Sequence, residues 1–150
     1  MISAFTRLLL RAGWAPIAVL ILHAIVIRTS FRQPLDFTMH FCGGAAIAYF
    51  MFEAQQVFQR VLGTPTAFGR YLIAFALACT VGVFWEFGEF FSDAFLHTHI
   101  QGSLPETMSD LIADATGAIV SLLLVCFVRY LIRRRTRRCR RTRDPAGRQA

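Results

Sequence analysis

Charged residues are scarce in this chain. Only 17% of its 150 residues are charged, whereas 55% are hydrophobic and the mean hydropathy is +0.50. Nine residues are acidic, and every basic residue is arginine because the sequence contains no lysine. This composition and length predict one compact unit embedded in a membrane.

Cysteines are few and show no paired spacing. Three of the four lie inside apolar segments, where a free thiol behaves as a small hydrophobic side chain; the four are Cys42, Cys79, Cys126 and Cys139. Neither a disulfide framework nor a zinc knuckle is therefore supported.

The sequence also lacks a basic face of the kind that binds nucleic acid. The net charge is +7 and the isoelectric point is near 10.3, but ten of the sixteen arginines lie from Arg129 onward, behind an apolar segment. Nucleic-acid-binding domains carry clustered basic residues on a folded surface. We therefore expect no nucleic-acid partner. Residues 133–150 are instead expected to form a disordered cytoplasmic tail that sets the topology and holds anionic lipid, at about 1 kcal/mol per arginine near the surface.

Four apolar stretches are long enough to cross a bilayer, which requires about 20 residues each. They cover about residues 8–27, 37–58, 71–91 and 104–132. These stretches predict an all-α membrane protein, with four transmembrane helices in two hairpins over residues 1–132. Ser103 and Glu106 form a capping-box pattern that marks the start of the fourth helix. No small-x-small cleavage site follows Ile27, so the first span is expected to be a retained signal-anchor.

The distribution of arginine predicts the orientation. Positive charge is enriched on the cytoplasmic side of membrane proteins. Arg28 and Arg32 are the only arginines expected on one side. The other side would carry the arginine-rich tail together with Arg7, Arg11, Arg60 and Arg70. Both termini are therefore predicted to be cytoplasmic, in a bacterial inner membrane.

Acidic residues gather where no arginine can balance them. Six of the nine lie between Glu86 and Asp114, and no arginine lies between Arg70 and Arg129. The predicted orientation places them at the outer ends of the third and fourth helices. Unpaired charges are costly inside a membrane, so the cluster requires a partner.

Helical spacing places these acids on two stripes. Glu86, Glu89 and Asp93 follow an i, i+3, i+7 pattern, while Asp110 and Asp114 are one turn apart with Gly117 on the same face. A connection over residues 92–103 would let both stripes face inward. His40, at the outer start of the second helix, would join them.

Facing carboxylates in a low-dielectric site either take up protons or bind a cation. Carboxylate oxygens suit Mg²⁺, Ca²⁺ or Mn²⁺, and an imidazole would also permit Zn²⁺. The candidate metal ligands are Glu86, Asp110, Asp114 and His40, with Glu89 as a proton-transfer group. The alternative is solvation at the water interface, which suits Asp93 and Glu106 better than Glu86 and Asp114.

Two segments have matched spacing. Asp36, His40 and Gly43 are spaced like Asp110, Asp114 and Gly117, and both sets open helices that run inward. Two hairpins related by an axis along the membrane normal would place the two sets opposite each other.

Three motifs resemble the VanZ-like superfamily of small polytopic bacterial membrane proteins. Segment 36–40 (Asp-Phe-Thr-Met-His), followed by Tyr49, resembles the signature that opens the second helix of those proteins. Segments 84–93 and 106–117 are similar to the Trp-Glu-x-x-Glu-Phe…Asp and Asp-Thr-Met-x-Asp-Leu…Gly stretches of its YjdF-type branch. The chain departs in having Glu106 in place of Asp and in lacking the Arg-Ser pair of VanZ proper. VanZ is linked to teicoplanin resistance, and the matched positions are Asp36, His40, Glu86, Glu89, Asp93, Asp110 and Asp114.

Three functions follow from these residues. The first is a site in the outer leaflet that acts on a lipid or cell-envelope precursor, with a divalent metal as a possible cofactor. The second is a non-catalytic binding or accessory protein whose carboxylates hold a partner. The third is ion or proton movement through an oligomer. No nucleophile motif is present, so the sequence leaves open whether the protein is an enzyme.

Overall fold

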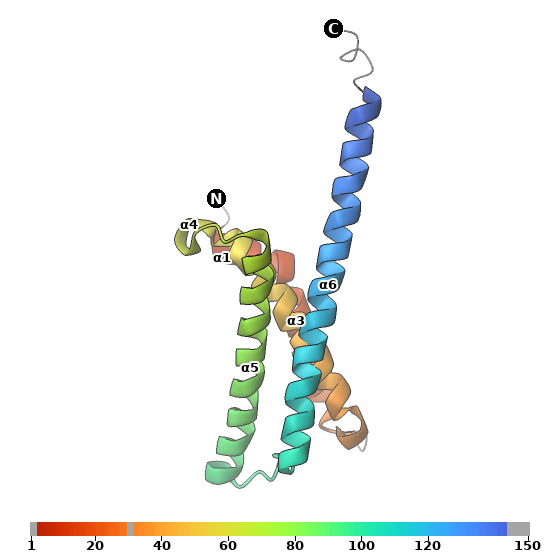
Figure 1. The fold of residues 1–150 in the computed structure, drawn as a ribbon. Helices are drawn as coiled ribbons and strands as arrows, with labels where there is room; N and C mark the ends of the chain where they lie inside the picture. The colour runs from red at the N-terminus through yellow and green to blue at the C-terminus, as the bar shows by residue number, and fades with distance from the viewer. Residues whose placement is uncertain (1–2, 30–31, 144–150) are drawn as a thin grey trace.

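The computed structural model describes residues 3–29 and 32–143, and nearly all of these are helical (Figure 1). The elements in chain order are α1 (Ala4–Leu8), the π-helix η1 (Leu9–Gly13), α2 (Trp14–Val26), α3 (Arg32–Val57), α4 (Gln59–Leu62), α5 (Ala67–Leu96) and α6 (Leu104–Arg143). No strand occurs in the described part of the chain.

Four helical segments are long and apolar enough to span a membrane. They are Ala4–Val26, Leu35–Val57, Ala67–Leu96 and Leu104–Arg137. Many of their apolar side chains face outward, including Leu10 at 73% exposed and Leu123 at 65%. Outward-facing apolar side chains are typical of helices surrounded by lipid, where each helix satisfies its own backbone hydrogen bonds. The predicted all-α architecture with four spans is therefore confirmed.

The connection between α5 and α6 is shorter than the predicted 92–103. Residues 92–96 continue α5, and the helix ends at His97, whose φ of 55° is left-handed. The Asp93 carboxylate accepts hydrogen bonds from Thr98 Oγ1 at 2.6 Å, Ile100 N at 2.7 Å and Gln101 N at 2.9 Å. Asp93 therefore shapes this connection, a role that the sequence analysis did not predict.

The start of α6 agrees with the sequence prediction, whereas its end does not. Its start is as predicted, because the Ser103 backbone N–H donates to Glu106 Oε2 at 2.5 Å. Its end differs, because residues 133–143 continue the helix where a disordered tail was expected. Arginine is a good helix former, and no glycine or proline lies between Gly117 and Pro145. The rest of the predicted tail, 144–150, lies outside the described residues.

Helix α3 is the centre of the bundle. It packs against α2, α5 and α6, and its crossing with α6 is the closest (Figure 1). A Cβ atom at Gly117 would overlap the Phe41 carbonyl oxygen, and one at Gly44 would overlap the Asp114 carbonyl oxygen. Small residues allow such close helix contacts in membranes. The crossing brings the amino-terminal halves of α3 and α6 together.

The apolar core lies on one side of this crossing. It consists of Ala48, Phe52, Ala74, Ala78, Ala118 and Leu122. Alanine predominates, which keeps α3, α5 and α6 close together over this region. The carboxylate cluster lies on the other side of the crossing, toward the α5–α6 connection.

Candidate functional site

Four ionisable side chains meet between three helices near the α5–α6 connection. His40 comes from α3, Glu86 from α5, and Asp110 and Asp114 from successive turns of α6. All four are buried, with exposures between 5% for Glu86 and 9% for Asp110. The structure thus brings together the four residues that the sequence proposed as metal ligands.

A glycine in α5 makes room for this cluster. A Cβ atom at Gly82 would lie 2.5 Å from Asp114 Oδ2. Gly82 is one turn before Glu86, so the absence of its side chain lets the Asp114 carboxylate reach the cluster. Gly43 in α3 lies beside the same carboxylate, since its Cβ position is 3.7 Å from Asp114 Oδ1.

The two ring nitrogens of His40 face different carboxylates. Nδ1 is 3.3 Å from Asp114 Oδ2, and Nε2 is 3.8 Å from Glu86 Oε1. With Asp114 ionised and the His40 ring neutral, Nδ1–H donates to Asp114, and the lone pair of Nε2 is directed toward Glu86. Asp114 therefore fixes the tautomer and the orientation of the ring.

Three of the four side chains fit a shared metal ion. One ligand atom from each of His40, Glu86 and Asp110 lies within 4.8 Å of the others. Two ligands of one Zn²⁺ or Mg²⁺ ion, each about 2.1 Å from it, are up to about 4.2 Å apart, so shifts of about half an ångström close the set. The set of two carboxylates and one imidazole matches the mixed oxygen and nitrogen chemistry of Mn²⁺ or Zn²⁺.

The Glu86 carboxylate supplies a second, independent indication. Its Oε1 atom is fully buried and has no hydrogen-bond partner among the described residues. The 3.8 Å separation from His40 Nε2 is too long for a hydrogen bond. Because buried polar atoms are rarely left unsatisfied, this oxygen is suited to a ligand between Glu86 and His40.

Asp114 lies beside the other three candidate ligands but is not part of the three-residue set that could share a metal ion. Asp114 contacts the opposite ring nitrogen of His40, as the carboxylate partners of metal-binding histidines commonly do. Gly117, named with the site in the sequence, serves the α3–α6 crossing instead.

The remaining candidates lie around the cluster. Glu89 is half-buried and accepts a hydrogen bond from Trp85 Nε1 at 3.1 Å. Asp36 is half-buried one turn before His40 on α3. The matched spacing of 36–43 and 110–117 predicted that His40 and Asp114 would face each other, and they do.

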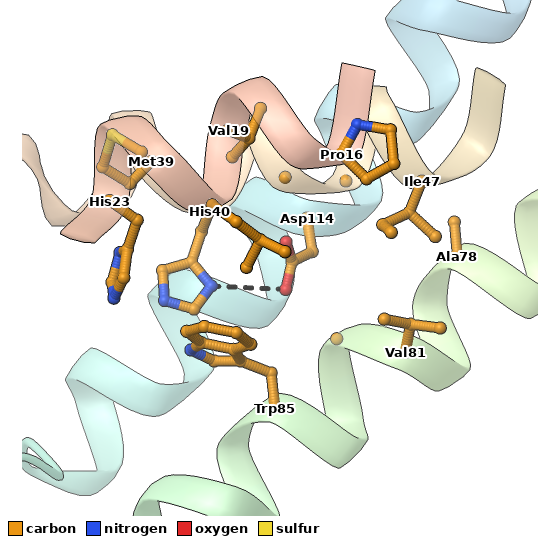
Figure 2. A pocket seen from close by; sticks show the side chains of 14 residues that line it. Pro16, Val19, His23, Met39, His40, Ile47, Ala78, Val81, Trp85 and Asp114 are labelled. Carbon is orange, nitrogen blue, oxygen red and sulfur yellow. Dashed lines mark hydrogen bonds and ion pairs between the residues drawn. The ribbon is translucent and has the colours of Figure 1, made fainter. Parts of the chain in front are cut away.

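An apolar pocket opens beside His40, as Figure 2 shows. It has a volume of about 270 Å³ and lies between α2, α3 and α5. Its walls are mostly apolar, including Val19, Ile47 and Val81, and His40 and Asp114 are among the polar residues that line it. The His23 and Trp85 rings lie on this pocket and meet edge to face at 5.2 Å. His23 therefore both packs on Trp85 and lines the pocket.

Comparison with known proteins identifies the family. Residues 5–131 match the family described as "Predicted membrane protein (DUF2238)". The chain belongs to this family. An uncharacterized protein of Thermotoga maritima is 34% identical over 91 residues, which are 60% of this chain and 46% of that protein. The chain thus spans about half the length of the curated relative that it matches, and no solved structure matches it.

The DUF2238 match agrees with the four membrane-spanning helices, so the chain is a multi-pass membrane protein. The matched range contains every site residue from Asp36 to Gly117. Neither the family description nor the Thermotoga relative assigns a ligand or an activity to these residues.

A second polar cluster of this DUF2238 protein was missed by the sequence analysis. At the other end of the bundle, Glu53 Oε2 lies 2.5 Å from Arg11 Nε, and Glu53 Oε1 lies 3.1 Å from Arg129 Nη2. Gln56 Nε2 also donates to Glu53 Oε1 at 2.9 Å. The available signal was that Glu53 is a lone acid in an apolar span, and Arg11 a lone base in another. Both require an oppositely charged partner inside a membrane.

Proposed function

We propose that this DUF2238 protein holds a divalent cation between His40, Glu86 and Asp110 and uses it to bind the polar group of a lipid or cell-envelope precursor. The observation that carries the proposal is the buried, unpartnered Glu86 oxygen, which faces His40 within the three-residue set. The VanZ-like resemblance of the segments around these residues agrees with a role in the cell envelope.

Each residue has a distinct part in this proposal. Glu86 and Asp110 supply anionic oxygens, and His40 Nε2 supplies a neutral nitrogen. Asp114 holds the imidazole through Nδ1. A divalent cation in such a site would polarise a phosphoryl or carbonyl oxygen of the bound group. Glu89, one turn from Glu86 toward the α5–α6 connection, is placed to exchange a proton with the solvent side.

The pocket beside His40 supports a substrate with an apolar portion. Its walls are mostly apolar, and the His40–Asp114 pair lies at its edge among the lining residues. Within the described residues the backbone of α2 stays apart from α5, so the pocket lies where lipid can approach between these helices. A lipid-linked substrate would place its apolar chain there and its polar group near His40.

The proposed orientation places this site at the extracytoplasmic face of a bacterial inner membrane. Helix α1 and the carboxyl-terminal end of α6 lie at the opposite end of the bundle from the α5–α6 connection (Figure 1). The arginine-rich end of α6 is on the terminal side, where positive charge favours the cytoplasm and contact with anionic lipid.

A non-catalytic role is the second candidate. The close α3–α6 crossing and the His40–Asp114 hydrogen bond hold the helices together, and no nucleophile motif accompanies the cluster. The same site would then bind a headgroup, a cation or a partner helix without chemistry. Ion or proton conduction is less favoured, because Glu53 is occupied by Arg11 and Arg129 and offers no relay toward the inner side.

Metal content of the detergent-purified protein, measured by plasma mass spectrometry, tests the proposal. We expect a near-stoichiometric divalent metal in the native protein and in Glu106→Gln, which removes an exposed carboxylate outside the cluster. We expect its loss in Glu86→Gln and in Asp110→Asn. Native protein without metal, even after incubation with Mn²⁺ or Zn²⁺, would overturn the cation site.

A further inference from the structure

A basic groove lies at the end of the bundle opposite the carboxylate cluster. It has a volume of about 1140 Å³ and runs between the α1–η1 segment and residues 56–61, which join α3 to α4. Three arginines line it, Arg7, Arg11 and Arg60, together with the amides of Gln56 and Gln59. No acidic residue is among its lining residues. The groove therefore carries positive charge and hydrogen-bond donors.

The nearby acid does not neutralise the groove. Glu53 is shared between Arg11 and Arg129, so its single charge already faces two guanidinium groups. The side chains of Arg7 and Arg60 have no ion pair or hydrogen bond within residues 3–29 and 32–143. The two arginines leave a surplus of positive charge that no described side chain balances.

The arrangement holds one arginine in place and leaves two free to close on a ligand. Arg11 lies in the π-helical segment η1 and is fixed through its Nε by the buried Glu53. Its terminal nitrogens are then available toward the groove. Guanidinium groups bind phosphate oxygens through two parallel hydrogen bonds, which favours arginine over other cations at phosphate sites. Gln56 and Gln59 add neutral donors on the same side of the groove.

The rim of the groove is apolar. Val57, Phe58 and Val61 lie along it, and Val61 is 83% exposed. Phe5 and Phe68, at 59% and 75% exposed, lie on helices at the same end of the bundle. Exposed aromatic and aliphatic side chains at the end of membrane-spanning helices are typical of the lipid interface. A ligand bound here is within reach of the lipid headgroups.

We infer that this groove binds a phosphate-bearing anion through Arg7, Arg11 and Arg60. Two sources share this chemistry: the headgroup of an anionic phospholipid in the adjoining leaflet, and a soluble phosphate compound. The inference is independent of the proposed cation site, because the two lie at opposite ends of the bundle.

Native mass spectrometry of the full-length protein in an uncharged detergent tests this inference. The probes are phosphatidylglycerol, phosphatidylcholine and inorganic phosphate. We expect phosphatidylglycerol to bind at one saturable site with at least tenfold preference over phosphatidylcholine. If excess inorganic phosphate displaces the lipid, a phosphate group alone is sufficient for binding. If it does not, the anionic lipid is the ligand.

Matched variants locate the binding. We expect Arg7→Gln/Arg60→Gln to weaken phosphatidylglycerol binding at least tenfold. Arg133→Gln/Arg134→Gln removes the same charge from α6, outside the groove, and should change binding less than twofold. Arg7→Lys/Arg60→Lys keeps the charge but loses the guanidinium geometry, so we expect intermediate binding. Equal weakening in the groove and α6 variants, or no binding of either phosphate probe, would overturn the inference.

Discussion

His40 is the residue on which the site depends, because its two ring nitrogens serve different partners. Nδ1 is held by Asp114, and Nε2 faces the unpartnered oxygen of Glu86. In metal sites, a carboxylate commonly accepts a hydrogen bond from the second ring nitrogen of a histidine ligand and so fixes its tautomer and orientation. The four acidic and histidine residues were predictable from the sequence, since each is costly in an apolar span. Their proposed division into three ligands and one orienting residue rests on the distances, which the sequence does not give.

The division of roles predicts unequal effects of two similar substitutions. Asp110→Asn removes a ligand and should abolish stoichiometric binding of the metal found in the native protein. Asp114→Asn leaves the three proposed ligands but loosens the imidazole, and loss of the carboxylate that holds a metal-binding histidine typically weakens metal affinity by about 10–100-fold. Titration calorimetry on the metal-free proteins measures both. Asp114→Asn binding as tightly as the native protein would contradict the orienting role.

At the scale of elements, the arrangement of the site depends on close helix approach. The sequence predicted four spans, and the capping pattern correctly placed the start of α6. It did not reveal that α5 extends to Leu96 or that α6 continues to Arg143. Helix ends depend on the local connection, such as the hydrogen bonds of Asp93, which composition alone does not show. The sequence analysis also did not predict the ion pair between Glu53 and Arg129, because the two residues are 76 positions apart.

The fit of α5 against α6 predicts opposite effects of two glycine substitutions in α5. Gly82→Ala would place a Cβ atom 2.5 Å from Asp114 Oδ2, whereas the Cβ position of Gly88 has nothing within 4 Å. Alanine in place of glycine in a helix otherwise stabilises by about 0.5–1 kcal/mol. An added Cβ atom that overlaps its neighbours, as at Gly82, instead lowers the free energy of unfolding by about 1–3 kcal/mol.

We therefore expect Gly82→Ala to lower the thermal unfolding temperature in detergent and to weaken metal binding. Gly88→Ala should leave both unchanged or raise the unfolding temperature slightly. A Gly82→Ala protein as stable as Gly88→Ala, with native metal binding, would show that Asp114 does not need this space.

At the scale of the whole molecule, the protein carries two opposite charge clusters at its two ends. The carboxylates and His40 lie toward the α5–α6 connection, and the arginines around Glu53 lie toward the termini. The separation of the two charge clusters was partly predictable, because the sequence has six acids and no arginine between Glu86 and Asp114. The basic groove was not, because it is formed by segments around Arg7 and Arg60 that are far apart in the sequence.

The orientation predicts which end is reached from outside the cell. In a background with the four native cysteines replaced by alanine, Leu96→Cys and Val61→Cys place one thiol at each end, on side chains that are 72% and 83% exposed. With a membrane-impermeant maleimide on intact spheroplasts, we expect labelling at position 96 only. Position 61 should react after permeabilisation. The reverse pattern would place the carboxylate site on the cytoplasmic side.

The most direct test of the account is pulsed electron paramagnetic resonance of the full-length protein loaded with Mn²⁺. The account predicts a nitrogen coupling from a directly bound imidazole, because His40 Nε2 faces the Glu86 oxygen and His40 belongs to the set with Glu86 and Asp110. The coupling should disappear in His40→Gln and persist in His97→Gln/His99→Gln, which alters the two histidines of the α5–α6 connection. A coupling that survives in His40→Gln, or bound Mn²⁺ without any nitrogen coupling, would contradict the proposed site.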